Sequence, residues 1–561
     1  MGNNKNTFDA IVIGSGISGG WAAKELCEKG LKTLMLERGR NVQHIVDYPT
    51  ANNNPWDFEY GLENSEKDEN ESPIQSLAYN ESNKHFFVND KEHPYLQESA
   101  FHWIRGYQVG GRSLTWGRQC YRLSDLDFEA NLKDGIAVDW PIRYKDISPW
   151  YDYVEKFVGI SGQPEGLSHL PDSVFLPPME MNDLEVHFKR QMKIKFPERC
   201  VTIGRTANLS TALYKRNACQ YRNLCSRGCP FGAYFSSNSS TIPAAMETGN
   251  LELKPFSIVV EIMYDEKTKK ASGVRVLDTE SNKTIEYYSK IIFLNASTIG
   301  SAYILLNSKS NTFPNGLGNS SGQIGHNLMD HHCRVGASAD FDGFKDRYYS
   351  GRRPNGIYIP RFRNLNEATK RADYIRGFGF QGGGFRLGWN DIAARTSGFG
   401  KEFKEKLIHP GDWAIMVSAW GETLPYFQNR IKIEGDEKDK WGLPLLSVQF
   451  NFGDNERIMR NDMKESASEM LERTGFRNVK QFDYHSVGGD CVHEMGTARM
   501  GINPKTSVLN KWNQMHDVSN VFITDGSCMT SSACQNPSLT YMALTARACD
   551  FAFSELKKGN I

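Results

Sequence analysis

Three cysteines lie close together in the stretch CQYRNLCSRGCPFGA, at Cys219, Cys225 and Cys229, and a proline follows the last of them. Thiols spaced in this way bind metal, pair as a disulfide or fill a core. Structural zinc uses four Cys or His ligands, and no histidine lies between His187 and His326 to complete such a set. A disulfide would leave one thiol over. Bacterial ferredoxin-type clusters use closely spaced cysteines that end in Cys-Pro, so the spacing favours an iron-sulfur cluster.

The N-terminal stretch DAIVIGSGISGGWAAKELCEKGLKTLMLERG predicts a βαβ unit. Its parts are a strand from Ala10 to Ile13, a helix from about Ser18 to Lys29 and a second strand from Thr33 to Leu36. Such a unit opens the doubly wound folds that bind dinucleotides at the end of the first strand.

A GxGxxG pattern joins the first strand to the helix, at Gly14, Gly16 and Gly19. Glycines there permit a tight turn and a close approach to a pyrophosphate, which the helix N-terminus stabilises. Glu37 directly follows the second strand, where a carboxylate accepts hydrogen bonds from the adenosine ribose. The pattern predicts a dinucleotide cofactor and does not distinguish FAD from NAD.

Bulk composition narrows the partners. The 561 residues carry 66 Lys and Arg against 66 Asp and Glu, which disfavours nucleic acid and anionic membranes and favours a neutral small molecule. No apolar stretch approaches the ~20 residues of a membrane helix, and the first apolar run lacks the flanks of a signal peptide. The odd number of cysteines, eleven, predicts reduced thiols or cluster ligands rather than a disulfide framework.

Five further motifs occur in order along the chain. Together they resemble the glucose/methanol/choline (GMC) oxidoreductases, a family of FAD enzymes, over almost the whole length. The motifs are GYQVGGRSLTWGRQCYR (106–122), NASTIGSAYILLNS (295–308), GQIGHNLMDHH (322–332), HEMGTARMG (493–501) and VFITDGSCMTSSACQNPSLTYMALTARACD (521–550).

The resemblance implies an α/β fold, in which a discontinuous Rossmann-like FAD-binding domain carries an inserted α+β substrate-binding domain built on a mainly antiparallel sheet. We assign 1–45, 100–125, 200–335 and 485–561 to the FAD-binding domain, with an iron-sulfur segment at 219–230, and 126–199 and 336–484 to the substrate-binding domain. Residues 46–99 are polar, turn-rich and without clear periodicity, which is typical of a surface excursion or lid.

The same resemblance implies the catalytic pair. The histidine of the HxxGT motif, here His493, is expected to face the flavin and accept the hydroxyl proton of an alcohol, a task that suits a neutral imidazole. The second position is His in some branches and Asn in others. Asn536 occupies it here, as in pyranose and cholesterol oxidases, and is expected to donate to the substrate oxygen. Asn536 also precedes Pro537, which suits the first turn of a C-terminal helix.

Cofactor contacts are also implied. They are expected from the N-terminal residues above, from Asn536 and Pro537, and from Gly110, Gly111, Ser113, Thr115, Asp525 and Gly526. Pyranose oxidases attach FAD through a histidine where this chain has Thr115. Threonine does not form that bond, so noncovalent FAD is expected.

The cysteine segment resembles that of bacterial FAD sugar dehydrogenases, in which three cysteines hold a 3Fe-4S cluster. The match is residue for residue at Cys219, Cys225 and Cys229. A cluster beside FAD implies a dehydrogenase that passes electrons to an outside acceptor, a cytochrome c or a quinone. Related catalytic subunits are exported with a small Tat-exported subunit, so periplasmic and cytoplasmic locations both stay open.

The expected substrate is a sugar or glycoside oxidised at a secondary hydroxyl, with C3 of a glucopyranoside favoured, as in glucoside 3-dehydrogenases. Oxidation of glucose at C1, of sorbitol or of gluconate at C2, and an oxygen-dependent alcohol oxidase with structural cysteines, are the alternatives. A noncatalytic flavoprotein is disfavoured because both catalytic positions are filled. The stretches YIRGFGFQGGGFRLGWND (374–391) and SAWGETLPYF (418–427) either line a sugar pocket or are ordinary sheet and loop.

Overall fold

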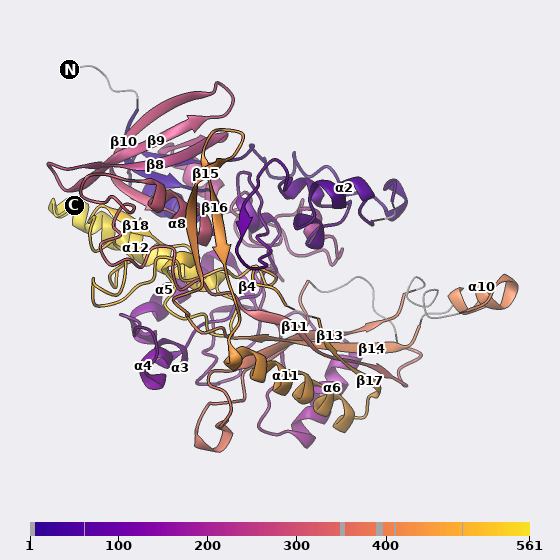
Figure 1. The fold of residues 1–561 in the computed structure, drawn as a ribbon. Helices are drawn as coiled ribbons and strands as arrows, with labels where there is room; N and C mark the ends of the chain where they lie inside the picture. Colours follow the sequence, from indigo (N-terminus) through magenta and orange to yellow (C-terminus); the bar gives the residue numbers. More distant parts are fainter. Residues whose placement is uncertain (1–5, 61, 348–353, 389–396, 409–410, 485) are drawn as a thin grey trace.

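The computed structural model describes residues 6–60, 62–347, 354–388, 397–408, 411–484 and 486–561. They form two lobes, each built on its own large sheet (Figure 1). In the described part of the chain, no helix is both long and apolar enough to cross a membrane.

The first lobe is built on a seven-stranded mixed sheet. In spatial order its strands are β7 (Leu251–Lys254), β2 (Thr33–Leu36), β1 (Thr7–Ile13), β10 (Lys283–Leu294), β9 (Lys270–Asp278) and β8 (Ser257–Asp265), and β18 (Val521–Ile523) pairs with β10. The strands from β7 to β10, and β18, pair in parallel, while β8, β9 and the first half of β10 form an antiparallel hairpin array. From Ala10 to Ile13, β1 is apolar and buried at every position because both faces of a central parallel strand are covered.

Helices cover this sheet and complete the predicted βαβ unit. They are α1 (Ile17–Glu28), α5 (Tyr144–Val158), α7 (Thr241–Glu247), α8 (Thr298–Asn307) and α12 (Ser538–Lys558). α1 packs against α7 and α12, and α5 packs against α12. The sequence prediction is confirmed here: β2 has the expected bounds, and α1 begins and ends one residue before them.

The second lobe is built on a six-stranded antiparallel sheet. In spatial order its strands are β17 (Arg477–Asp483), β11 (His332–Phe341), β14 (Trp413–Gly421), β13 (Phe378–Arg386), β12 (Ile357–Ile359) and β6 (Thr202–Ile203). α11 (Asp454–Arg473) and α6 (Asp183–Lys195) lie along one face of it (Figure 1). Their apolar side chains share one core with the sheet. The α/β lobe with a separate antiparallel lobe is the fold class expected from the sequence.

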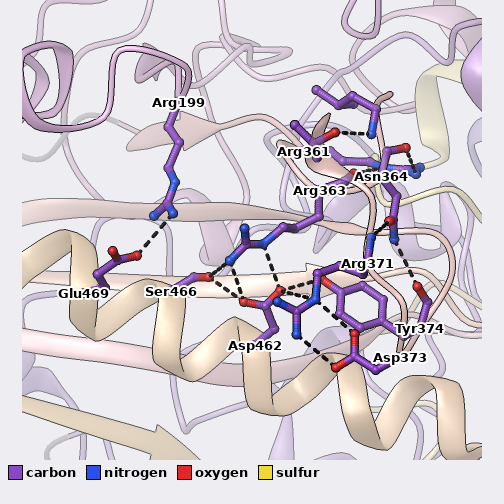
Figure 2. Close-up of polar contacts among 12 residues, drawn as sticks. Arg199, Arg361, Arg363, Asn364, Arg371, Asp373, Tyr374, Asp462, Ser466 and Glu469 are labelled. Carbon is purple, nitrogen blue, oxygen red and sulfur yellow. Dashed lines mark hydrogen bonds and ion pairs between the residues drawn. The ribbon is translucent and has the colours of Figure 1, made fainter. Parts of the chain in front are cut away.

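Polar contacts fasten α11 to the loop before β13. Figure 2 shows the side chains of Arg363, Tyr374 and Ser466 directed at Asp462 of α11. Nε and Nη2 of Arg363 each donate to the carboxylate at 2.9 Å, and the hydroxyls of Tyr374 and Ser466 donate to it at 2.6 and 2.9 Å. These hydrogen bonds outweigh the opposing effect of burial and hold the pKa of Asp462 below its usual value.

Several segments belong to a different lobe from the one to which the sequence analysis assigned them. β15 (Arg430–Lys438) and β16 (Pro444–Gln449) form a small sheet with β3 (Leu96–Gln97), and β15 packs on α8 of the first lobe. β6 belongs to the second sheet. α5, from the segment 126–199, shares the core of the first lobe, whereas α6 shares that of the second.

The segment 46–99 follows the surface of the first lobe in short elements and contributes buried side chains. Tyr48 and Phe86 are 5% and 1% exposed and form a small core with Leu114. Its elements are η1 (Pro55–Asp57), α2 (Glu66–Glu71), η2 (Gln75–Leu77) and η3 (Lys84–Phe86). The remaining short elements are η4 (Gly111–Leu114), α3 (Asp125–Phe128), α4 (Ala130–Asp134), β4 (Ile160–Ser161), β5 (Phe175–Leu176), η5 (Cys225–Arg227), η6 (Glu367–Thr369), α10 (Gly400–Ile408) and η7 (Gly526–Cys528).

Candidate active site

The turn between β1 and α1 is shaped for a phosphate group. Gly14 has φ 94°, and a Cβ built on it would lie 2.3 Å from the carbonyl oxygen of Asn295. A Cβ on Gly19 would lie 1.9 Å from the carbonyl oxygen of Gly14, so side chains are excluded at both positions. Gly16 caps α1 without a side-chain hydrogen bond, and a Cβ there would meet nothing within 4 Å. The backbone N–H groups of the first turn thus remain available to an anion.

Glu37 lies at the end of β2 and is 6% exposed. Its carboxylate accepts hydrogen bonds from the hydroxyl and backbone N–H of Ser15 and from the N–H of Gly39, at 2.5, 3.2 and 2.9 Å. Burial raises its pKa, and these donors oppose the rise. The carboxylate is therefore fixed beside the glycine turn, where a ribose of a dinucleotide would lie.

A large cavity of about 590 Å³ extends from this turn to the second lobe. The predicted cofactor residues that line it are Gly14, Gly16, Glu37, Gly111, Ser113, Thr115, Asp525, Gly526, Asn536 and Pro537, and His493 joins them. Gly19 and Gly110 lie behind the wall. Gly110 has φ 91°, and a Cβ on it would lie 1.7 Å from Oδ1 of Asn238, so it shapes η4 from the inside.

The C-terminal motif forms the opposite wall. Asp525 is 5% exposed and accepts hydrogen bonds from the Ser301 hydroxyl at 2.5 Å and from the backbone N–H of Ser527 at 3.0 Å. α12 begins at Ser538, and its first turn borders the cavity through Pro537, Ser538 and Tyr541. The buried Tyr541 hydroxyl has no hydrogen-bond partner among the described residues, which leaves it for a bound molecule.

His493 and Asn536, 43 positions apart in the sequence, meet on this wall. The Asn536 side-chain nitrogen lies 3.3 Å from Nε2 of His493. The other end of the amide is also fixed, since the side-chain nitrogen of Gln381 donates to Asn536 Oδ1 at 2.7 Å. On its far side His493 Nδ1 lies 2.9 Å from Nδ1 of His331, whose Nε2 is 3.4 Å from the carbonyl oxygen of Ser532.

This chain of contacts fixes the position of every proton along it. The Ser532 carbonyl only accepts, so the proton of neutral His331 is on Nε2 and its Nδ1 accepts from Nδ1–H of His493. The Nε2 atom of His493 is therefore bare and accepts from the Asn536 amide. A bare Nε2 on the cavity wall has the lone pair that a general base needs, and the second N–H of Asn536 is free to donate to a bound oxygen.

Burial keeps both rings neutral. It lowers the pKa of His331 to about 4. The pKa of His493 lies well below its usual value because of burial, of the neighbouring His331 and of the charge of Arg112. Arg112 in turn pairs with Glu494 through two hydrogen bonds of 2.6 and 3.1 Å.

Sequence reasoning missed His331 and Gln381 as parts of the site. Both stood in stretches already singled out, His331 in GQIGHNLMDHH and Gln381 in the glycine-rich stretch 374–391. Neither pattern shows that His331 contacts His493 or that Gln381 contacts Asn536. Gln381 and Trp420 line the cavity from β13 and β14, so both stretches contribute to the pocket, while 389–391 lie outside the described residues.

Cys219, Cys225 and Cys229 border a second, small cavity of about 30 Å³. Burial raises the pKa of the Cys219 and Cys225 thiols, and the neighbouring Cys229 raises both further. Among the described residues no group of three metal-binding side chains is arranged to hold a single ion. All three cysteines border the same small cavity, together with Arg222, Pro230 and other residues of this segment.

Cys333 and Cys491 form a disulfide, with Cα atoms 6.2 Å apart. The expectation of reduced or cluster-binding thiols is wrong for this pair. The bond could not be predicted from the sequence because 158 positions separate the two cysteines. The backbone pairing of Met329 with Met495 brings their segments together. The other nine cysteines, all among the described residues, form no disulfide.

The glycine turn, the buried carboxylate of Glu37, the large cavity and the His493–Asn536 pair form the site of an FAD-dependent oxidoreductase that acts on CH–OH groups. The chain belongs to the GMC oxidoreductase family, whose N-terminal model matches residues 8–333 and whose C-terminal model matches residues 425–545. The first lobe is the FAD-binding domain and the second is the substrate domain. The open first turn of α1, the unpartnered Tyr541 hydroxyl and the fixed carboxylate of Glu37 fit the cofactor.

Relatives span the whole chain at low identity. The chain is 28% identical to 2-methyl-1,2-propanediol dehydrogenase of Mycolicibacterium austroafricanum, over 98% of this chain and 96% of that one. It is 25% identical to the fructose dehydrogenase large subunit of Gluconobacter japonicus, over 100% of both. Among solved structures, formate oxidase of Aspergillus oryzae has a TM-score of 0.62 at 14% identity, over 99% of this chain and 100% of that one. That likeness shows the fold.

Proposed function

We propose that this chain is a dehydrogenase that oxidises a secondary hydroxyl of a sugar or glycoside to a ketone, with C3 of a glucopyranoside favoured. The observation that carries the proposal is the bare Nε2 of His493 beside the Asn536 amide on the cavity wall. This pair takes the hydroxyl proton and orients the carbinol, while bound FAD supplies hydride acceptance.

The substrate end of the cavity supports a polyhydroxylated ligand. Gln119, Gln381 and Arg118 supply polar groups there, and Trp116 and Trp420 supply aromatic surface. Amides and guanidinium groups hydrogen-bond to hydroxyls, and indole rings cover the apolar face of a sugar ring. A long-chain alcohol has too few hydroxyls to satisfy these groups.

We further propose that Cys219, Cys225 and Cys229 hold a 3Fe-4S cluster, which when bound carries single electrons towards an outside acceptor such as a cytochrome c or quinone. The position of Arg118 supports this. It lines the large cavity, and its charge lowers the pKa of the Cys219 and Cys225 thiols against the effect of burial. The thiols therefore lie within electrostatic reach of the flavin site.

A partner subunit and export belong to the same proposal. One relative is named as a large subunit, which supports an assembly with a small, Tat-exported subunit. The buried disulfide supports folding in an oxidising compartment, because such bonds persist in the periplasm and are rare in the cytosol. We propose a periplasmic location reached by co-export with that subunit.

A small diol is the second candidate substrate, favoured by the relative named 2-methyl-1,2-propanediol dehydrogenase. One experiment separates the candidates. The anaerobically purified protein is screened with sugars, glycosides, sorbitol, gluconate and diols against an artificial acceptor, and the oxidised carbon is identified by NMR. A 3-keto glycoside supports the proposal. Turnover restricted to diols, or turnover with oxygen alone in a protein without iron, overturns it.

A further inference from the structure

The histidine pair joins two segments, 329–333 and 491–495, which run antiparallel and in register. Met329 and Met495 face each other and exchange two backbone hydrogen bonds of 2.9 Å each. Two residues further along, His331 faces His493 at 2.9 Å between Nδ1 atoms. Another two residues on, the Cys333–Cys491 disulfide closes the register. The disulfide and the histidine pair are thus successive cross-links between the same two segments.

The segment that carries His493 is held under strain. Val492, between Cys491 and His493, has φ 55°, a left-handed conformation that a β-branched residue rarely adopts. The buried carboxylate of Asp330 accepts hydrogen bonds from the N–H groups of Gly489, Cys491 and His493 at 2.9, 3.2 and 3.0 Å. These hydrogen bonds fix the backbone, and the disulfide fixes the residue just before the strained one.

We propose that the Cys333–Cys491 disulfide positions the catalytic base: it holds Val492 in its left-handed conformation and keeps His493 hydrogen-bonded to His331, so that Nε2 stays bare and aimed at Asn536. The proposal rests on the proposed role of His493 as the base. Without the bond, Val492 relaxes to an ordinary conformation, the imidazole turns, and the Nδ1 contact between the rings is lost.

The alternative is a disulfide that only stabilises the fold. Both of its cysteines are 4% exposed, so packing alone gives each a structural role. The two roles differ in what they change. A positioning bond acts on proton transfer and leaves substrate affinity alone, whereas a structural bond affects FAD content, affinity and rate together.

The test uses Cys333→Ser, Cys491→Ser and the double variant, with Cys27→Ser as the control for loss of a buried thiol remote from the site. Anaerobic stopped-flow reduction of the FAD-loaded proteins gives the rate constant and its dependence on substrate concentration. We expect each single variant to slow flavin reduction at least tenfold, with the half-saturating substrate concentration within twofold of the wild type. The double variant should be no slower than the singles, since all three lack the same bond.

The pH dependence of the flavin-reduction rate distinguishes the two roles, because a disulfide that only stabilises the fold would leave it unchanged. His331 and Asp330 contact His493, and the charge of Arg112 acts on it. Arg112 is in turn paired with Glu494 and acts on the hydroxyl of Tyr541. A ring released from His331 gains access to water, so the reduction rate of the variants should fall with decreasing pH at a higher pH than in the wild type.

Combination with His331→Ala completes the test, because a disulfide that acts through the histidine pair adds no further loss to that variant. His331→Asn, whose carbonyl oxygen replaces the accepting Nδ1, should recover part of the rate. Losses that multiply between the disulfide and His331 would overturn the proposal, as would a double cysteine variant that is reduced at the wild-type rate or that no longer holds FAD. If His493→Ala itself has no effect, the proposed function fails first, which distinguishes the two outcomes.

Discussion

The side-chain amide of Gln381 donates to Oδ1 of Asn536 at 2.7 Å. This hydrogen bond joins the two lobes beside His493. Gln381 belongs to β13 of the substrate sheet, and Asn536 directly precedes the first turn of α12 in the FAD lobe. The bond decides which end of the Asn536 amide faces His493. The substrate lobe therefore orients the Asn536 amide as well as lining the pocket.

Replacement of Gln381 by glutamate should reverse this arrangement. A carboxylate only accepts, so Asn536 would turn its N–H groups towards position 381 and its oxygen towards His493 Nε2. We expect Gln381→Glu to slow flavin reduction by ~10²-fold, the cost of a misplaced catalytic group, and Gln381→Leu to slow it by only ~10-fold. Stopped-flow reduction measures both, and equal losses in the two variants would contradict the directional argument.

His493→Ala should retain FAD and slow flavin reduction by ~10²-fold or more, the contribution of a general base. The FAD contacts come from other segments, so the absorption spectrum should be preserved. Asn536→Ala serves as the comparison, because it removes a donor and leaves the base. Flavin reduction in His493→Ala at the wild-type rate would refute the assignment.

The pH dependence of the wild-type enzyme follows from the same site. Burial, together with the charge of Arg112, lowers the pKa of His493, so the neutral ring persists as pH falls through 6.5. A histidine with its ordinary pKa would instead become protonated there, and the reduction rate would fall tenfold per pH unit below it. We expect the rate to remain nearly constant between pH 7.5 and about 6. A loss of about fourfold across that range, as expected for a histidine with a pKa of about 6.5, would show that His493 is less shielded than the structure indicates.

The sequence predicted those parts of the molecule that depend on local pattern. The strand-turn-helix-strand unit with Gly14, Gly16 and Glu37 was confirmed because apolar period and glycine placement are properties of adjacent residues. The two-lobe fold followed from resemblance over the whole chain. The bounds of this unit differ from the prediction by up to three residues, since β1 begins at Thr7 instead of Ala10.

The contacts that could not be predicted from the sequence all join residues that lie far apart along the chain. The contact of His331 with His493 spans 162 positions, and that of Gln381 with Asn536 spans 155. The register between two distant segments sets the first, and the packing of two lobes sets the second. The same applies to Cys333 and Cys491, whose pairing a count of cysteines cannot reveal. The position of β15 and β16 against the FAD lobe likewise depends on their contact with α8.

Thr115 supports noncovalent FAD. It lines the cavity, and its hydroxyl lies 3.5 Å from the carbonyl oxygen of Arg112. A threonine hydroxyl is a poor nucleophile and forms no bond of the kind a histidine ring makes with the flavin. Acid or heat denaturation should therefore release all FAD into solution. Yellow colour that stays with the precipitated polypeptide would contradict this expectation.

Asp462 is expected to stabilise the second lobe (Figure 2). It is 6% exposed and accepts from Arg363, Tyr374 and Ser466, so Asp462→Asn leaves the half-buried guanidinium of Arg363 without its countercharge. We expect the free energy of unfolding to fall by ~2 kcal/mol in urea at pH 7. Because its folded pKa is lowered, this stabilisation is present above the pKa of an unfolded Asp and is lost as pH falls through the folded pKa.

Asp373→Asn is the matched control for that variant. Asp373 pairs with Arg371 on the surface, and its side chain is 45% exposed. Exposed pairs contribute little, so a change within about 0.5 kcal/mol is expected. Equal destabilisation by the two substitutions would show that burial of the Asp462 network is not what matters.

Cys225→Ser is the variant that separates the two halves of the proposed reaction. If Cys219, Cys225 and Cys229 hold a 3Fe-4S cluster, the wild-type protein should contain about three irons per chain and show the EPR signal of that cluster when oxidised. Loss of one thiolate should remove or destabilise the cluster. Cys200→Ser, which replaces a half-buried thiol outside this group, should keep both iron and signal.

The flavin half-reaction should survive in Cys225→Ser. His493, Asn536 and the glycine turn lie on the large cavity, whereas Cys225 borders the small one, so sugar should still reduce the flavin in an anaerobic stopped-flow trace. Delivery of electrons to a cytochrome c should fall sharply in the same protein. Damage to both halves together would indicate structural cysteines, and zinc in place of iron would indicate a different metal. A folded Cys225→Ser protein that still reduces the cytochrome at the original rate would remove the support for a relay through these cysteines.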